Sequence, residues 1–381
     1  MQVFEFDPSG NFRVPVTYDF NLTVEQQLAS SLAMRVAYVG SMSRHQFVNL
    51  DLNPSVNTGA FVNGAWVKST LGTNQRRPYN TAPVVGPCTS ATGCDAGFQQ
   101  IVVASMTGSG GYNSLQVTLD KKMSHGVSFL ANYTWSKSMD NLPYSVKVGN
   151  TEDINVGESY VYPQFPAGAS NMPAGSYVTN IQALDHGISD LDHRSVISLS
   201  YGYQLPKLRN GNRALKYAAN GWRTNGLVQR HTGDALTVYT GTDSSATGLA
   251  QERGQRNYSV APYTANWQTD LGNCAAGTSC HNWFTTGAFS TPVNAGPGTG
   301  FGNVVKGSMF GPAVTNWDGS VARTFSVYRE SNLEFKAEYF DVLNHTILSN
   351  PNITTSNAAF GTIKGTQGGP RIAQFALKFI F

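Results

Sequence analysis

Charged side chains are scarce in this chain of 381 residues. They make up 13% of it, about half the share found in an ordinary globular protein. The net charge of +3 is small and the basic residues are scattered, which gives no reason to expect binding to nucleic acid. Long apolar runs are missing as well. Because no stretch of 18 consecutive apolar residues occurs, a transmembrane helix is not expected.

Two kinds of short signal are also missing. Residues 1–20 have no basic start followed by an apolar run, so no secretory signal is visible. The chain shows no nucleophile elbow, no phosphate-binding loop and no pair of histidines on a helix, which are the marks of common catalytic sites. We therefore expect neither an enzyme nor a cofactor.

Cysteine is rare but regularly placed. Cys88 and Cys94 enclose five residues, and Cys274 and Cys280 repeat that spacing in surroundings rich in Gly, Ser and Thr. The even count and the matched spacing predict two local disulfides formed in an oxidising compartment. Free thiols and a zinc site are the alternatives, although zinc favours shorter spacings.

What the chain does contain is a period of two. In residues 111–140 the odd positions Leu115 to Leu119 and Val127 to Trp135 are apolar, while the even positions Gln116, Thr118, Ser128, Asn132 and Thr134 are polar. Such alternation is typical of strands with two different faces, and the Gly-containing link at residues 123–126 predicts a hairpin. Each arm has about 10–13 residues, close to the length a tilted strand needs to cross a bilayer.

Seven further segments repeat this alternation, which gives about nine long strands. With the two arms of 111–140, the predicted strands are the segments 18–28, 31–45, 191–205, 220–240, 313–327, 332–345 and 371–381.

The links between these strands alternate in length. Short links are expected near 29–31, 123–126 and 327–331, with an intermediate one at 206–218. Long links are expected at 46–110, 140–190, 241–312 and 345–370, and their Gly, Ser, Thr and Asn residues show no readable pattern. Outer-membrane barrels sort their connections in this way, with short periplasmic turns and long extracellular loops. An antiparallel soluble fold with one solvated face is the alternative.

The fold class predicted is therefore all-β, an antiparallel transmembrane β-barrel of the outer-membrane type. In such a barrel the polar face of each strand lines the lumen. An odd count of nine strands does not close an ordinary bacterial barrel, so we expect an incomplete, C-terminal portion whose missing strands lie upstream. The polar positions that we expect to face the lumen are Asn316, Asp318, Glu334, Lys336 and Glu338.

Several segments, in their order along the chain, resemble one family. They are "GYNSLQVTLDKKMSHGVSFLANYTWSKSMDN", "DLDHRSVISLSYGYQLP", "NGWRTNGLVQRHTGDALTV", "GPAVTNWDGSVARTF", "FKAEYFDVLNHTILSNPN" and the terminal "PRIAQFALKFIF". Together they resemble the TonB-dependent outer-membrane receptors of the Oar-like group. In that family an N-terminal sandwich and a plug precede a barrel of about 22 strands.

The resemblance implies that residues 1–381 are the C-terminal part of such a barrel, with the plug and the N-terminal barrel strands absent. It implies a place in the outer membrane of a Gram-negative-type cell and a role in TonB-energised transport of a large substrate. The implied partners are outer-membrane lipid and lipopolysaccharide, the barrel-assembly machinery, and the TonB system through the missing plug. A small passive pore or adhesin, and a secreted loop-rich β binding protein, are the alternatives.

The end of the chain resembles the signal by which the barrel-assembly machinery recognises its clients. A lipid-facing last strand would show the same residues, and both interpretations can hold together. The signal would consist of Phe375, Leu377, Phe379 and the terminal Phe381.

Two groups of polar residues in the long links are candidates for binding small ions. Carboxylates and imidazoles near residue 190 could bind a metal ion, and arginines in two other loops could meet an anionic ligand. A solvated polar rim and ordinary loop charge are the alternatives. The metal candidates are Asp185, His186, Asp190, Asp192 and His193, and the anion candidates are Arg76, Arg77, Arg253 and Arg256.

Overall fold

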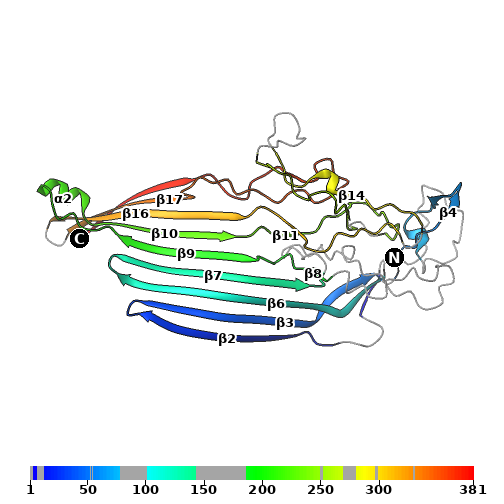
Figure 1. Cartoon of the computed structure of the whole chain (residues 1–381), viewed down its shortest axis with the longest axis horizontal. Helices are drawn as coiled ribbons and strands as arrows, with labels where there is room; N and C mark the ends of the chain where they lie inside the picture. Colours follow the sequence, from blue (N-terminus) through cyan, green and yellow to red (C-terminus); the bar gives the residue numbers. More distant parts are fainter. Residues whose placement is uncertain are drawn as a thin grey trace.

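Nine long strands lie side by side in one antiparallel sheet in the described part of this computed structural model (Figure 1). The structure describes residues 3–6, 13–51, 53, 55–77, 101–142, 186–248, 252–268, 280–296, 299–328 and 331–381. Along the sheet each long strand pairs with the long strands before and after it in the sequence. These strands are β2 (Val16–Ala29), β3 (Leu32–Asp51), β6 (Ile101–Ser124), β7 (Val127–Asp140), β9 (Ser195–Gln204), β10 (Trp222–His231), β16 (Val314–Tyr328), β17 (Ser331–Phe340) and β19 (Ile372–Ile380).

The register gives the sheet one apolar and one polar face, as the alternation predicts. Val321 is opposite Ala337, which is opposite Phe375. One residue along, Ser320 is opposite Glu338, which is opposite Gln374. Because directly opposed residues share a face and successive residues alternate, the period of two is preserved across neighbouring strands.

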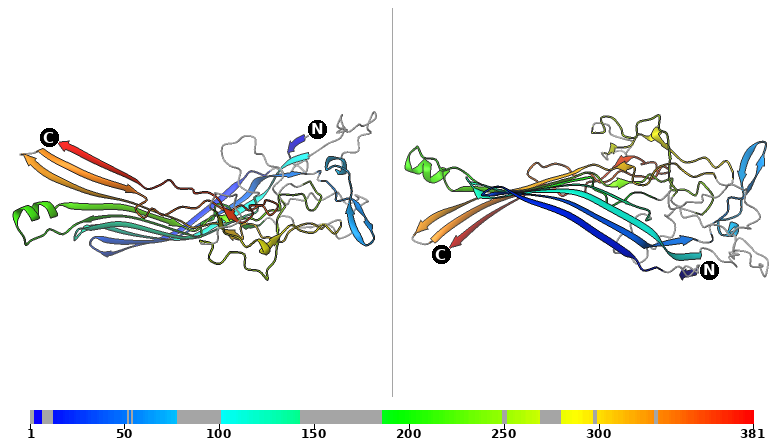
Figure 2. Two further views of the ribbon diagram at one scale, coloured as in Figure 1. Left: turned by 90° about the horizontal axis from the view of Figure 1, so that it is seen from above. Right: turned by 60° about the horizontal axis from the view of Figure 1, so that its bottom comes forward.

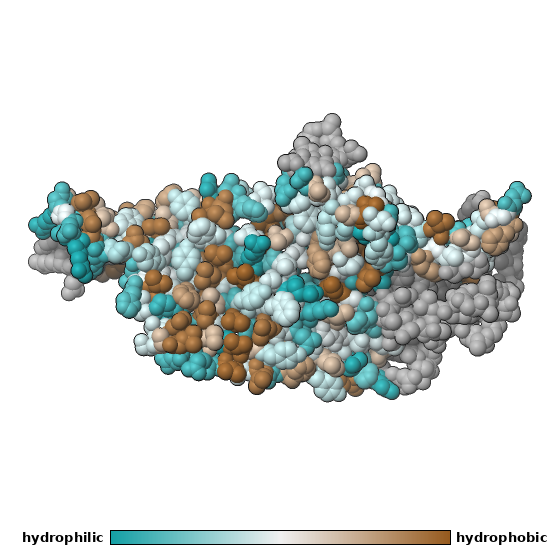
Figure 3. Space-filling model, viewed as in Figure 1, coloured by the Kyte–Doolittle hydropathy of each residue, from teal (hydrophilic) through white to brown (hydrophobic). Residues whose placement is uncertain are grey.

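Among the described residues no protein core covers either face of the sheet. The buried apolar side chains of the long strands are few and mostly small, namely Ala37, Val48, Ala322 and Ala337. Large apolar side chains stay exposed, including Leu22 at 69%, Trp135 at 55% and Leu377 at 67%. Figure 3 shows apolar side chains gathered over the strands away from the loop end. A sheet whose apolar face is left open in this way fits a lipid environment.

Short and long connections lie at opposite ends of the sheet (Figure 1). At one end are the turns Ser30–Ser31 and His125–Gly126, the latter with φ angles of 51° and 80°, a left-handed pair that suits the twist of a tight hairpin. The described parts of the long connections lie at the other end. The predicted sorting of the links is therefore confirmed.

The intermediate link contains a short helix that the sequence reading does not include. Helix α2 (Arg213–Ala219) lies beyond the ends of the strands on the short-turn side (Figure 1). Asn212 caps it, since its side chain accepts a hydrogen bond of 2.7 Å from the backbone N–H of Leu215. This is the ordinary function of an asparagine at a helix N-terminus.

The predicted strand 220–240 is too long. β10 ends at His231, and the next residues leave the sheet to form β11 (Ala235–Leu236), which pairs with β15 (Met309–Phe310). At Gly233 the chain passes so close to Gly311 that an added Cβ would lie 1.9 Å from the Gly311 carbonyl oxygen. Only glycine permits that approach, and it marks the point where the strand gives way to the loops.

The sheet is twisted and open (Figure 2). β2 and β19 are its outermost long strands, and among the described residues no pairing joins them. Two short strands pair off this path, β1 (Val3–Phe6) with β6 in parallel and β8 (Gly187–Ile188) with β7. Within the described ranges no helix is long and apolar enough to span a membrane.

The long connections fold together into a structure that we call the loop cap, formed by the described residues of 53–77, 232–313 and 341–371. Its short elements are β4 (Gly59–Val62), β5 (Ala65–Lys68), β12 (Gln255–Arg256), β13 (His281–Asn282), β14 (Phe289–Ser290), β18 (Thr362–Ile363), η1 (Asn74–Arg76) and η2 (Thr286–Ala288), besides β11 and β15. The sequences of these loops show no readable pattern, whereas in the structure the loops form a hydrophobic core of their own.

Candidate functional site: the polar sheet face and the loop cap

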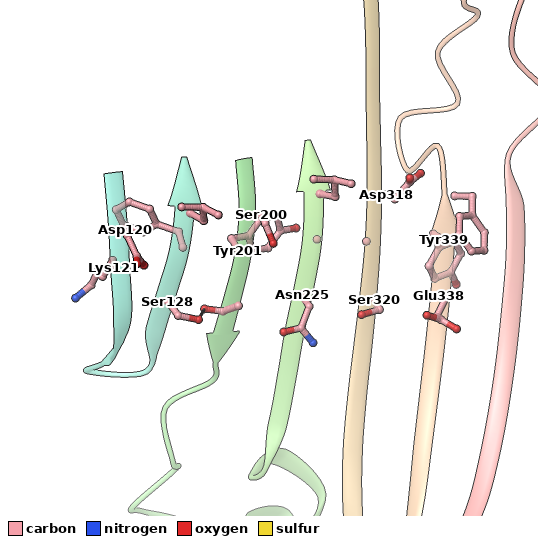
Figure 4. Close-up of a pocket in the computed structure, with 17 residues that line it drawn as sticks. Asp120, Lys121, Ser128, Ser200, Tyr201, Asn225, Asp318, Ser320, Glu338 and Tyr339 are labelled. Atoms are coloured by element: carbon pink, nitrogen blue, oxygen red, sulfur yellow. Dashed lines mark hydrogen bonds between the residues drawn. The ribbon is translucent and has the colours of Figure 1, made fainter. Parts of the chain in front are cut away.

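A row of polar side chains crosses the polar face of the sheet (Figure 4). Ser128, Asn225, Ser320 and Glu338 come from β7, β10, β16 and β17 and lie on one rung, with Gly202 of β9 between the first two. The next rung contains Asp120, Leu130, Ser200, Leu227 and Asp318. These rungs line a shallow hollow of about 500 Å³, which suits contact with water or a polar ligand.

Charged residues on this face form two ion pairs, one between β10 and β17 and one within β17. The Arg223 guanidinium of β10 donates to the carboxylate of Glu334 in β17, and the bond spans the intervening strand β16. Lys336 Nζ lies 2.6 Å from Glu338 Oε1. Both pairs remain partly exposed, so each stabilises the fold modestly. Because of these pairs, positive and negative side chains lie next to each other on the polar face, which does not carry charge of a single sign.

The five predicted lumen positions all lie on this polar face. Glu334, Lys336 and Glu338 take part in the pairs above, and the Asn316 side-chain amide donates to Asp318 at 3.1 Å. Asp318 also accepts a hydrogen bond of 2.9 Å from the backbone N–H of Asp341, so it holds the start of the connection after β17. The sequence pattern places these five residues on one face, as the structure does. Arg223, the partner of Glu334, is not among the predicted residues.

The loop cap has a hydrophobic core drawn from two long connections. Phe284 is 1% exposed and its ring centroid lies 5.8 Å from that of Phe289 and 6.3 Å from that of Phe360. Backbone hydrogen bonds join the same connections, for example from Tyr239 to the Ile353 carbonyl at 2.9 Å. The core consists of Leu236, Val238, Phe284, Ala288, Phe289, Val304 and Phe360.

The third connection is attached to the cap by polar contacts. The backbone N–H of Ser55 donates to the Thr247 carbonyl at 2.9 Å, and the Asn57 side chain donates to Asn294 Oδ1 at 2.9 Å. A loop assembly with buried aromatic side chains and ladder-like hydrogen bonds is ordered before any ligand arrives, which lowers the entropy cost of binding.

The four arginines predicted to meet anions are buried in the cap, with 5–8% of each residue exposed. Arg76 donates to the carbonyls of Leu71, Val56 and Ala246 and lies 3.8 Å from Asp243. Burial lowers the pKa of Arg76, an effect that the negative charge of Asp243 partly offsets. The structure gives this arginine a structural role within the cap, and binding of an anionic ligand by the four arginines remains a prediction.

The other three arginines lie in similar surroundings. Arg77 donates to the side chain of Asn74 and the carbonyl of Asn53, and Arg256 donates to the carbonyls of Ala288 and Val260. The backbone of Arg253 pairs with Tyr239. A guanidinium has five N–H donors. One arginine can therefore donate hydrogen bonds to several loop segments at once.

Glu252 is a fully buried carboxyl group in the same cap. Its side chain accepts hydrogen bonds from the hydroxyl groups of Ser244 and Ser245 and from the backbone N–H of Ser245. Burial raises the pKa of Glu252, and the nearby charge of Asp243 adds to this, while the hydrogen bonds act in the opposite direction. Sequence alone offered no signal for this residue beyond its neighbouring serines.

The acidic and histidine segment near residue 190 does not converge on one point. The Asp192 carboxylate accepts a hydrogen bond of 2.5 Å from the backbone N–H of Ser138 and lies 3.5 Å from Arg194. His193 Nδ1 is 3.1 Å from the carbonyl of Thr232. His186 lines a separate hollow, Asp190 lies in the turn between them, and Asp185 lies outside the described residues. No group of three metal-ligating side chains forms within the described ranges.

Of the four cysteines, Cys280 alone lies in the described ranges. It is 1% exposed and disulfide-bonded. Cys88, Cys94 and Cys274 lie outside the described residues, so the two pairings remain predictions.

The C-terminal strand β19 is an edge strand with an exposed apolar side. Phe375, Leu377 and Phe379 are opposite Ala337, Phe335 and Leu333 of β17, and they are 63%, 67% and 53% exposed. The terminal Phe381 is 96% exposed. The three residues of β19 thus share the apolar face, and a role of all four residues in assembly remains a prediction.

The chain was compared with curated proteins and with solved structures. Among curated proteins no sequence matches the chain. Among solved structures, the chain is similar to the outer membrane transporter YddB from Escherichia coli, at 10% identity with a TM-score of 0.42. The similarity covers 96% of this chain and 32% of that one, so the chain spans about a third of the transporter's length.

The family comparison covers nearly the whole chain. The model of the outer membrane beta barrel domain matches residues 1–374. The antiparallel sheet, its uncovered apolar face and its sorted connections are typical of that family, and the open sheet is consistent with an incomplete barrel. The protein is therefore one of the outer membrane, and the chain belongs to the outer membrane beta barrel domain family.

Proposed function

We propose that this chain is a C-terminal part of a TonB-dependent, Oar-like transporter barrel that moves a large substrate across the outer membrane. The observation that supports the proposal most strongly is that the two sheet faces and the loop end differ in chemical character. One sheet face is apolar and uncovered, the other bears paired charges around a shallow hollow, and a folded cap stands at the long-loop end.

The open sheet supports the proposal that this chain is only part of a larger barrel. Unpaired backbone groups are costly in lipid, so strands that span a membrane form closed barrels. β2 and β19 are not paired with each other in the described structure. Further strands completing the barrel, and a plug that reaches the TonB system, would make the functional unit larger than this chain.

In this assignment the loop cap recognises the substrate and the polar face forms part of the wall of its path. The protein makes and breaks no covalent bonds, and the chain needs no cofactor. Its partners are the remaining strands and plug, outer-membrane lipid and lipopolysaccharide, and the barrel-assembly machinery. The arrangement of the cap supports recognition, because a preformed loop surface binds with little loss of entropy.

The test is to isolate the native product from the outer-membrane fraction with an antibody against residues 313–381, after cross-linking in energised cells. The proposal expects a product well above 41.0 kDa that is cross-linked to TonB, and loss of that cross-link when cells are de-energised. A product of the size of this chain without any TonB cross-link would favour a passive pore or adhesin and would overturn the proposal.

A further inference from the structure

Residues 205–221, which we call the basic foot, form a folded projection at the short-turn end of the sheet (Figures 1 and 2). Asn220 fastens its two halves, accepting a hydrogen bond of 2.5 Å from the backbone N–H of Leu208 and donating to the Leu208 carbonyl at 3.4 Å. The foot begins beside β10, where the backbone N–H of Leu205 donates to the Trp222 carbonyl at 3.0 Å. It is therefore a defined structure rather than a loose turn.

The foot is fastened to the apolar face of the sheet by one arginine. Arg323 is on the same rung as Trp222 and Phe335, and it is 4% exposed. Its guanidinium donates to the carbonyls of Tyr217 and Ala218 in α2. It also lies 4.1 Å from the ring centroid of Phe325. A cation on an apolar face needs such partners, and these bonds hold α2 at the short-turn end of that face.

Aromatic contacts strengthen this attachment. The Trp222 indole N–H donates to the Ala218 carbonyl at 3.0 Å, and the rings of Tyr217 and Phe325 lie 6.0 Å apart. Both Trp222 and Phe325 belong to the apolar face. Aromatic rings with one wet and one apolar side favour the boundary between lipid and water, so the foot lies at that boundary.

The exposed surface of the foot has one sign of charge. Lys207, Arg209, Arg213 and Lys216 carry four positive charges, and residues 205–221 contain no Asp or Glu. Among the described residues none of the four forms an ion pair or a side-chain hydrogen bond, and the first three are exposed. Exposed apolar side chains, including Leu208, Leu215 and Tyr217 at 39%, 51% and 56%, lie among them.

We propose that the basic foot binds the phosphate groups of anionic phospholipid headgroups in the membrane leaflet on the short-turn side. A basic, partly apolar segment at an interface attracts anionic lipid through charge while its apolar side chains enter the acyl boundary. Lipid is the partner favoured over a soluble anion, because Arg323 fastens the foot to the face that lipid covers. The inference goes beyond transport and does not rest on it.

The test uses the full chain reconstituted in phosphatidylcholine vesicles, with spin-labelled phosphatidylglycerol or phosphatidylcholine as the probe. The fraction of each probe immobilised by the protein gives the lipid preference. Wild type should prefer phosphatidylglycerol by about threefold or more, and the preference should fall as salt is raised. The variant Arg209→Gln/Arg213→Gln should lose most of it.

A matched control removes the same charge elsewhere. Lys68 and Lys364 are exposed in the loop cap, away from the foot, so Lys68→Gln/Lys364→Gln should keep the wild-type preference. Circular dichroism of the three proteins should show equal strand content. An equal loss in both variants, no preference in wild type, or a preference abolished by inorganic phosphate at constant ionic strength would each overturn the proposal.

Discussion

Lys306 in the loop cap forms an ion pair with Asp140 at the end of β7, and its ammonium group also donates to the Leu142 carbonyl. The two side chains are 7% and 13% exposed. The pair joins the cap to the sheet at a place where water is largely excluded, so each charge depends on the other.

Lys306→Met should destabilise the cap, because it leaves the Asp140 carboxylate buried without its partner. Loss of one member of a buried pair costs about 3–5 kcal/mol. Hydrogen exchange of the cap residues 299–313 should become much faster than in wild type. The double variant Lys306→Met/Asp140→Leu should recover much of the protection, and failure to recover it would show that the ion pair is not the cause.

Phe284→Ala should loosen the cap and leave the sheet intact. The side chain is buried among Phe289 and Phe360, and replacing a core phenylalanine by alanine costs about 3–5 kcal/mol. We expect proteolysis within the cap, with the strands of the reconstituted protein still resistant. Val293, which is 80% exposed, supplies the control, since Val293→Ala should behave as wild type. Equal resistance in both variants would contradict the cap core.

The stability of the cap should fall as pH rises, through Glu252. Burial raises the pKa of Glu252 in the folded cap above its ordinary value of 4.5, so the folded state binds the proton more tightly than the unfolded chain. Its contribution to stability is present in full below pH 4.5 and is lost as pH rises through the folded pKa. Hydrogen exchange measured over a range of pH should show that the free energy of cap unfolding falls as pH rises. Glu252→Gln should make this pH dependence weaker. An unchanged slope in the variant would assign the effect to another group.

The terminal phenylalanine should matter for assembly more than its neighbour. Phe381 continues the series of apolar-face residues of β19, whereas Ile380 is opposite Asn332 on the other face. Phe381→Ala should lower the amount of protein in the outer-membrane fraction several-fold, and Ile380→Ala should have little effect. Equal amounts of all three proteins would argue that the end of the chain serves only as a lipid-facing strand.

The sheet could be predicted from the sequence because the alternation of apolar and polar residues is visible within each strand. Alternation in a segment such as 332–340 states directly which residues share a face, and Glu334, Lys336 and Glu338 do share one. The sorted lengths of the links then indicated a barrel of the outer-membrane type. No long-range information was needed for either step.

The cap and the ion pairs could not be predicted in this way. Leu236, Phe284 and Phe360 meet in one core, but they come from distant segments and follow no period. Arg223 and Glu334 are 111 positions apart. The arginines predicted to meet ligands are instead buried by loop carbonyls, a role that depends on which loops fold against each other. Such contacts arise only from tertiary packing.

The most direct test of the account is the environment of two adjacent residues in β16. Ser320 lies on the polar face and Val321 on the apolar face. Cysteine variants of each, spin-labelled in the reconstituted protein, should differ sharply in accessibility to oxygen, which partitions into lipid, and to a water-soluble nickel chelate. The account predicts that the label at 320 meets the chelate and the label at 321 meets oxygen, with the same alternation at Lys336 and Ala337. Equal exposure of both positions to the chelate would mean that the apolar face does not lie in a membrane.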